Sequence, residues 1–150
     1  MFKRRYRYRF GDIDHAGIAY YPALLHACHC AFEDFWADDL GVTYPSLMSE
    51  HNLGFPAVHL EADFLAQIRY GDEPEIAVGV LRVGRSSVDF GFWWTTGEPA
   101  CHVRITTVAV AMDTLQKMAL PERWRQEFTA RLVTEPPFHG RGAGGSANLS

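Results

Sequence analysis

The chain has 150 residues, 47% of them hydrophobic, and a formal net charge of −4 at pH 7. This length and composition are typical of one globular domain with a sizeable core, and the charge excludes the overall basic field of many nucleic-acid-binding proteins. No apolar run approaches the roughly 18 residues of a membrane span, and the N-terminal MFKRRYRYRF lacks the apolar segment of a signal peptide.

The first predicted element is a strand over residues 2–10. Its side chains alternate between a basic face and an aromatic face. The basic face holds Arg5, Arg7 and Arg9, and the aromatic face holds Tyr6, Tyr8 and Phe10. We interpret the basic face as a solvated strand surface.

A long helix is predicted over residues 22–40. Pro22 suits the first turn of a helix, where its missing N–H costs nothing, and Gly41 provides a stop. Apolar residues recur along it at three- and four-residue spacing: Leu24, Ala27, Cys28, Ala31, Phe32, Phe35 and Trp36. Few residues opposite them are strongly charged before Glu33, so the helix is expected to be largely buried.

Further short elements follow this helix. A helical turn is predicted over 43–52 and an amphipathic helix over 120–132. Turn sequences separate the predicted strands, which are residues 55–67, 75–85, 86–96 and 101–113. The Gly/Ser/Pro-rich tail after residue 133 is predicted to be disordered.

The order of the elements predicts an α+β fold, in which one antiparallel sheet wraps around a long central helix. We place the folded domain at residues 1–133 and the tail at residues 134–150. The helix leaves one face and the edges of such a sheet exposed. A second copy of the chain can cover them, so we predict self-association. The three cysteines are an odd number without a disulfide pattern, so we expect a reducing, cytoplasmic location.

Two carboxylates lie in the loop FGDIDHAGIAYYP, just before the long helix. Thioester hydrolysis needs an attacking oxygen, which a carboxylate supplies directly or by activating water. It also needs donors for the developing oxyanion, and the unpaired N–H groups at a helix start are such donors. The alternative is that Asp12 and Asp14 only cap turns by binding backbone N–H groups.

The stretch F-G-D-x-D-x-A-G-I-x-Y-Y-P, followed by CHCAFEDFW and FPAVHLEADFLAQIRYGD, resembles the hotdog-fold acyl-CoA thioesterases. The resemblance covers residues 2–112 and is to the 4-hydroxybenzoyl-CoA and 1,4-dihydroxy-2-naphthoyl-CoA thioesterase branch. It implies a hotdog fold, homodimers formed by joining sheets side by side, often paired into homotetramers, and active sites at subunit interfaces. It makes Asp14 the catalytic carboxylate, as nucleophile or general base, and Asp12 a structural residue.

The resemblance also assigns the helix start. The backbone N–H near Tyr21 polarises the thioester carbonyl in this family. A neighbouring branch that prefers short acyl chains has histidine at this position, so Tyr21 favours the aromatic-acyl branch. His15 stands where the family often has proline or a small residue, and its role is left open between tuning Asp14 and simple solvation.

Two pairs are candidates for binding the acyl group. His29 lies near the position at which the 4-hydroxybenzoyl enzymes contact the substrate hydroxyl, and Glu33 shares its helix face. One alternative is a structural His29–Glu33 bond. Another is a zinc site with His26 and Cys30, which is possible on spacing, although helix geometry points these side chains apart and no second ligand cluster is visible. His59 and Glu61 share a strand face that lines the pocket in this fold, or they form a surface pair.

Arginine is the side chain best suited to bind the phosphates of CoA, because it donates two parallel hydrogen bonds. By the resemblance, a basic run at the turn between the second and third sheet strands binds them, partly across the interface. Here that run supplies Arg82, Arg85, Ser86 and Ser87. The alternative is that these are ordinary exposed turn residues.

The sequence thus predicts an acyl-CoA thioesterase that hydrolyses an aromatic or medium-size acyl-CoA, with no cofactor other than CoA and no metal. Three alternatives stay open. They are a non-catalytic acyl-thioester-binding module, a thioesterase for carrier-protein-bound acyl groups, and a hotdog dehydratase, which the D-x-D-x-x-G loop argues against.

Overall fold

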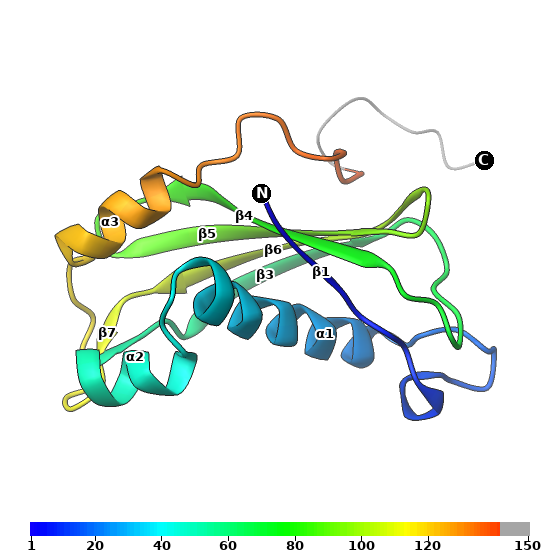
Figure 1. Cartoon of the computed structure of the whole chain (residues 1–150), viewed down its shortest axis with the longest axis horizontal. Helices are drawn as coiled ribbons and strands as arrows, with labels where there is room; N and C mark the ends of the chain where they lie inside the picture. The colour runs from blue at the N-terminus through cyan, green and yellow to red at the C-terminus, as the bar shows by residue number, and fades with distance from the viewer. Residues whose placement is uncertain (142–150) are drawn as a thin grey trace.

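A five-stranded antiparallel sheet lies against one long helix in the computed structural model, which describes residues 1–141 (Figure 1). The order of strands across the sheet is β1-β4-β5-β6-β3. Their bounds are β1 Phe2–Arg5, β3 Ala57–Phe64, β4 Glu75–Val83, β5 Ser87–Thr95 and β6 Pro99–Val108. The predicted α+β hotdog architecture is confirmed.

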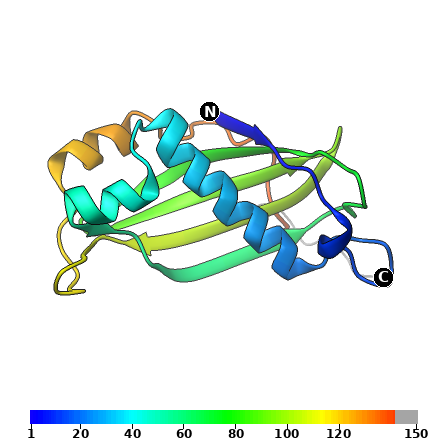
Figure 2. The same ribbon diagram turned by 60° about the horizontal axis from the view of Figure 1, so that its bottom comes forward.

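Helix α1 (Tyr21–Asp34) runs diagonally across one face of the sheet (Figure 2). Its buried residues follow the predicted spacing: Ala23, Leu24, Ala27, Cys28, Ala31 and Phe32. The helix continues as a π-helical turn, η2 (Phe35–Asp39), in which the Leu40 amide donates to the Phe35 carbonyl, 3.1 Å away. This wider turn carries the fully buried Trp36, whose ring reaches the end of the core.

The sheet has two different faces because side chains alternate along each strand. On β5, Phe90 and Phe92 contact Phe32 of α1, with ring centroids 5.0 and 6.3 Å apart. We call this side the helix face. Asp89 and Trp93 point to the opposite side, which we call the outer face. Strand register adds these residues to the outer face: His59, Glu61, Asp63, Gly79, Gly91, His102 and Arg104.

Aromatic packing closes the end of the core beyond α1. The ring of Trp36 lies 5.0 Å from Trp124 and 5.6 Å from Phe128, both on α3 (Glu122–Thr129). Helix α2 (Tyr44–His51) and a small ladder of β2 (Leu53–Gly54) with β7 (Val110–Ala111) complete this end. The ladder was not predicted, and it divides the predicted strand over 101–113 into β6 and β7.

The first strand is shorter than predicted. It ends at Arg5, and its predicted continuation to residue 10 is wrong. Regular pairing with β4 stops because Pro74, which precedes β4, has no N–H to donate and only accepts a bond from the Tyr6 amide. Tyr8 is then fully buried, whereas Phe10 in the short turn η1 (Phe10–Asp12) is 86% exposed.

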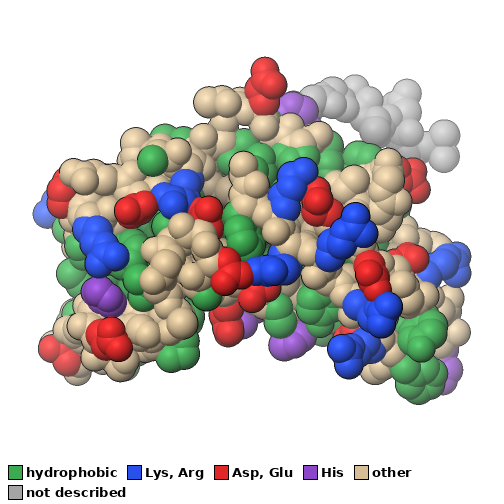
Figure 3. All heavy atoms as spheres, viewed as in Figure 1, with side chains coloured by type: hydrophobic (Ala, Val, Ile, Leu, Met, Phe, Trp, Pro, Cys, Tyr) green, Lys and Arg blue, Asp and Glu red, His purple; other side chains and the backbone are tan. Residues whose placement is uncertain are grey.

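Basic side chains of the first strand are paired with acids. Lys3 binds Glu75, and Arg4 binds Asp34 and Asp38 of the α1–η2 segment. Blue and red side chains are accordingly interspersed on the face of the molecule that Figure 3 shows. Such exposed pairs contribute little stability, but they leave no single-sign basic surface on this face.

Part of the C-terminal tail lies against the sheet. The Trp93 indole donates a 3.2 Å hydrogen bond to the Phe138 carbonyl, and Arg141 donates one of 3.0 Å to the Phe64 carbonyl. The predicted domain boundary after residue 133 stays a prediction, and the disorder predicted for 142–150 lies outside the described residues. Within residues 1–141, no helix is long and apolar enough to cross a membrane.

Candidate active site

The loop between β1 and α1 folds back on itself as a small hairpin. Ile13 and Ala19 form an antiparallel bridge, and the Asp14 amide donates to the Ile18 carbonyl, 3.0 Å away. Asp12 closes the base of this hairpin: its carboxylate accepts from the Arg9 amide at 2.8 Å, and its carbonyl accepts from the Tyr20 amide. One carboxylate oxygen and the backbone carbonyl oxygen of Asp12 thus both hold the hairpin together, which gives Asp12 a structural role.

Asp14 lies exposed at the tip of the hairpin. Its Oδ1 accepts hydrogen bonds from the Ala16 and Ile18 amides, at 2.8 and 3.4 Å. Gly17 makes the turn possible with a φ of 77°, a left-handed conformation that favours glycine. Within residues 1–141, Oδ2 has no hydrogen-bond partner. The Asp14 carboxylate thus caps a turn with one oxygen and presents the other to solvent. A turn-capping role and a catalytic role for Asp14 are therefore compatible.

Helix α1 presents a single unpaired donor at its start. Pro22 has no N–H, and the amides of Ala23 and Leu24 both donate to the Tyr20 carbonyl, at 2.9 and 3.3 Å. The Tyr21 amide is therefore the first-turn donor that finds no acceptor among the described residues. It carries the partial positive charge of the helix N-terminus, which suits a developing oxyanion. The Tyr21 side chain is 64% exposed and leaves room beside it.

A cavity of about 220 Å³ lies between α1 and the helix face of the sheet. Its wall is mainly aromatic and aliphatic and is made by Leu25, Cys28, His29, Phe32, Tyr44, Phe55, Pro56, Ala57, Phe90, Phe92, Ile105 and Thr107. Burial raises the pKa of the Tyr44 hydroxyl, which stays protonated. We did not predict from the sequence that Tyr44 and Phe55 line a pocket. The signal that could have identified them is an aromatic residue near each end of the short helical turn.

His29 lies in the wall of this cavity and is paired with Glu33. His29 Nε2 is 2.8 Å from Glu33 Oε1, and both side chains are about half exposed. His26 instead contacts Cys30, with Nε2 3.6 Å from Sγ. These histidines therefore have different partners, and the residues that the structure describes contain no group of three His, Cys, Asp or Glu side chains able to hold a metal ion.

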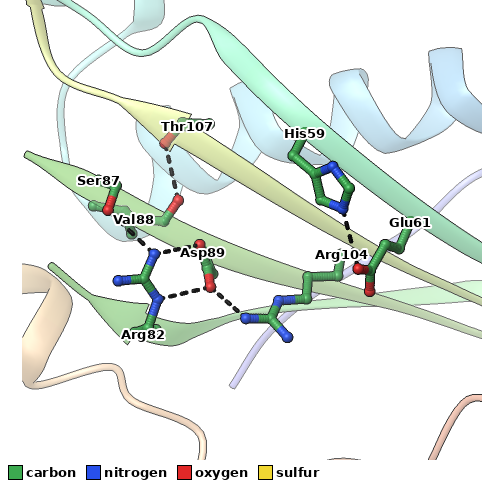
Figure 4. Close-up of polar contacts among 8 residues, drawn as sticks. All are labelled: His59, Glu61, Arg82, Ser87, Val88, Asp89, Arg104 and Thr107. Carbon is green, nitrogen blue, oxygen red and sulfur yellow. Dashed lines mark hydrogen bonds and ion pairs between the residues drawn. The ribbon is translucent and has the colours of Figure 1, made fainter. Parts of the chain in front are cut away.

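His59 and Glu61 lie on the outer face of β3, away from α1. Figure 4 shows them bonded to each other, with His59 Nε2 3.0 Å from Glu61 Oε1. Within one chain, the thickness of the sheet separates them from the cavity beside His29. The structure therefore does not bring this pair together with the pair on α1.

Arg82 and Ser87 belong to a network around Asp89 (Figure 4). Arg82 Nε and Nη2 donate to the Asp89 carboxylate at 2.9 and 3.2 Å, and Arg104 Nη2 donates to it at 2.5 Å. Burial disfavours the charged form of this carboxylate, which is only 1% exposed, but the hydrogen bonds from both arginines outweigh burial and lower its pKa to about 2.

The Asp89 network was not predicted from the sequence. The available signal was one carboxylate within the apolar strand SSVDFGFWW, since a buried acid requires a partner.

Arg85 and Ser86 lie in the turn between β4 and β5. Their carbonyls accept from the Leu120 and Ala109 amides, at 2.8 and 2.7 Å. β4 begins beside Arg5, close to the loop that carries Asp14, and its nine residues end at this turn. At about 3.3 Å per residue, the turn lies almost 30 Å along the sheet from that end. In one chain, these residues and Asp14 are at opposite ends of the sheet.

Comparison with known proteins agrees with this architecture. Residues 8–131 match the thioesterase-like superfamily. A 1,4-dihydroxy-2-naphthoyl-CoA hydrolase of Synechococcus elongatus (strain ATCC 33912 / PCC 7942 / FACHB-805) is 32% identical over 77% of this chain and 85% of its own length. The hydrolase of the same name from Synechococcus sp. (strain WH7803) is 29% identical over 85% of this chain and 90% of its own.

Solved structures share the fold. A thioesterase superfamily protein from Jannaschia sp. CCS1 superposes with a TM-score of 0.84 at 23% identity, covering 88% of this chain and 93% of that one. A 1,4-dihydroxy-2-naphthoyl-CoA thioesterase from Synechocystis gives 0.75 at 21% identity, over 85% and 95% of the chains. Sequence match and fold agree, and the chain belongs to the thioesterase-like superfamily as a hotdog-fold thioester hydrolase.

Proposed function

We propose that this protein hydrolyses an aromatic or medium-size acyl-CoA to the free acid and CoA, with Asp14 as the catalytic carboxylate. The observation that carries the proposal is the pairing of two groups at one end of α1. Asp14 is held through Oδ1 while Oδ2 is free, and the Tyr21 amide is the unpaired donor of the helix start. The similar hydrolases of Synechococcus support CoA thioesters as the substrate class.

The Tyr21 amide donates a hydrogen bond to the thioester oxygen as negative charge develops there. Asp14 either attacks the acyl carbon and forms an anhydride that water then hydrolyses, or takes a proton from the attacking water. In both routes the C–S bond breaks, the sulfur leaves as thiolate and takes up a proton, and a carboxylic acid is released. No cofactor beyond the CoA of the substrate enters this scheme.

The aromatic cavity favours a flat acyl group. A neutral His29 that donates from Nε2 to Glu33 keeps its proton on that nitrogen, which leaves Nδ1 as an acceptor. An acceptor at the wall of an aromatic cavity suits a hydroxyl group on the acyl ring. Glu33 therefore acts on the substrate through the tautomer of His29.

We further propose a homodimer, or a homotetramer built from such dimers, with active sites between subunits. The edge strand β3 exposes Val58, Leu60 and Phe64, an apolar row suited to the same strand of a second copy. A partner could then bring the turn with Arg82, Arg85, Ser86 and Ser87 towards the substrate. Joining sheets side by side keeps His59 and Glu61 on the outer face, so we do not place this pair at the acyl group. The free thiols of Cys28, Cys30 and Cys101 fit a reducing cytoplasm.

The test is thiol release from a panel of aromatic and medium-chain acyl-CoAs, and from the matching carrier-protein thioesters, by wild type, Asp14→Asn and Asp12→Asn. Acyl-CoA binding by wild type is measured alongside. Asparagine at 14 keeps the carbonyl oxygen that caps the turn, so the loop geometry is preserved while the carboxylate is lost. We expect turnover by wild type and at least a 100-fold loss of kcat in Asp14→Asn, with a smaller loss in Asp12→Asn.

Three results would point elsewhere. No hydrolysis of any CoA or carrier-protein thioester would reject the proposal, and undiminished turnover by Asp14→Asn would reject the role of Asp14 alone. Acyl-CoA binding without turnover would identify a binding module. Hydrolysis of only carrier-protein thioesters would identify the carrier-protein variant of the enzyme.

A further inference from the structure

Two glycines form the centre of the outer face of the sheet. Gly79 on β4 and Gly91 on β5 are register partners, and both are buried. A Cβ at Gly91 would lie 2.2 Å from the ring of Trp93, and one at Gly79 would lie 2.3 Å from Val133 Cγ2. The two glycines therefore allow an indole ring and a valine from beyond α3 to lie flat on the sheet.

The chain after α3 runs across this face. It first pairs with β4, because the Val133 amide donates to the Val80 carbonyl at 2.8 Å. The next residues, 134–141, form what we call the C-terminal strap, seen in Figure 1 on the side of the sheet opposite α1. Phe138 accepts from Trp93 on β5, and Arg141 reaches β3 through the Phe64 carbonyl.

The strap has an inner and an outer side. Pro136, Phe138 and Gly140 are half-buried, whereas the residues between them are exposed. A Cβ at Gly140 would lie 2.1 Å from Asp63 Oδ2, so glycine fits closely over β3. Under this cover, Trp93 is only 1% exposed. The alternation and the glycine contact indicate a segment that fits this face rather than one that crosses it by chance.

The strap is nevertheless held by few bonds. A cavity of about 340 Å³ remains between the strap and part of the face, and its lining includes Glu61, Asp63, His102 and Arg104. Its bonds to the sheet are those of Phe138 and Arg141, each from one side chain to one carbonyl. Release of the strap would expose Trp93 while leaving the five-stranded sheet paired.

We propose that the C-terminal strap occupies the outer face in place of a second copy of this chain and thereby confines self-association to other surfaces. The uncovered face would suit another sheet, since its centre would present the flat Trp93 ring and Val133 above the two glycines, and packed sheets lie about 10 Å apart. The face also carries both signs of charge, because Glu61 on β3 is the register partner of Arg104 on β6. A two-fold axis can place such a face against itself with opposite charges matched.

The experiment compares the full-length chain with two truncations, 1–133 and 1–141, by light scattering during gel filtration. The shorter truncation removes the strap and keeps Val133 over Gly79, and the longer one keeps the strap and serves as the control. We expect the full-length chain and 1–141 to have the same mass, and 1–133 to show at least a doubled mass. Oxidative labelling should find Trp93 protected in all three.

An unchanged mass of folded 1–133 would overturn the proposal, as would a larger assembly in which Trp93 is reactive, because growth would then use another surface. If 1–133 does not fold, the full-length variant Gly140→Val decides, since its side chain would lift the strap from Asp63. A mass increase in this variant supports the proposal, and an unchanged mass overturns it.

Discussion

The indole N–H of Trp94 donates a hydrogen bond of 3.0 Å to the hydroxyl of Tyr8, and both side chains are fully buried. Tyr8 stands two residues before the loop that carries Asp14, while Trp94 lies on the helix face of β5. Backbone bonds from Tyr8 to Asp72 and from Gly71 to Tyr8 hold the same residue on its other side. The active-site loop is therefore anchored directly to the centre of the sheet.

Replacing Tyr8 by phenylalanine should destabilise the protein. The ring still fills its site, but the Trp94 N–H loses its acceptor in the core, which costs about 1–3 kcal/mol of unfolding free energy. Urea denaturation measures this loss, and Tyr70→Phe is the control because Tyr70 is 66% exposed. We also expect a lower kcat because the loop is less firmly held. Equal stability of the two variants would show that the Tyr8–Trp94 bond contributes nothing measurable.

His29 should distinguish an acyl ring that carries a hydroxyl group from one that does not. We expect His29→Phe to reduce kcat/KM for a hydroxylated aromatic acyl-CoA by about 10- to 100-fold, because an aromatic ring remains but the acceptor Nδ1 is lost. Turnover of the matching acyl-CoA without the hydroxyl should change little. Glu33→Gln is the control, since its amide oxygen still accepts from His29 Nε2. Equal losses for both substrates in His29→Phe would assign His29 to packing instead.

Stability should fall in acid through Asp89. The pKa of this carboxylate is lowered from 3.8 to about 2 in the folded protein. A lowered pKa adds stability above pH ~4, and this contribution is lost as the pH falls from about 4 to 2, where the folded state also takes up the proton. The shift corresponds to roughly 2 kcal/mol.

Urea unfolding of wild type and Asp89→Asn at neutral pH and near pH 2 tests this contribution. We expect the variant to be less stable at neutral pH and the difference to shrink in acid. Glu98→Gln, at an exposed turn, should leave the unfolding free energy unchanged at both pH values. A difference between wild type and Asp89→Asn that is constant with pH would mean that packing, rather than charge, is lost.

Several features of this protein could be predicted from local sequence. The spacing of Leu24, Ala27, Ala31 and Phe32 identified a buried helix, because helical periodicity depends only on neighbours in the chain. Pro22 marked the helix start for the same reason. Features that depend on distant residues were missed. The end of β1 at Arg5 depends on Pro74, and the charge on Asp89 depends on arginines from two other strands.

The sequence by itself determined the long buried helix, the run of antiparallel strands after it and the D-x-D loop before it, since periodicity, turns and capping are local properties. Only the tertiary structure decided which face each strand residue occupies. It placed His59 and Glu61 on the side of the sheet away from α1, and it laid residues 134–141 across the outer face. These outcomes depend on register and on burial against distant segments, because a shift of one residue exchanges the two faces of a strand.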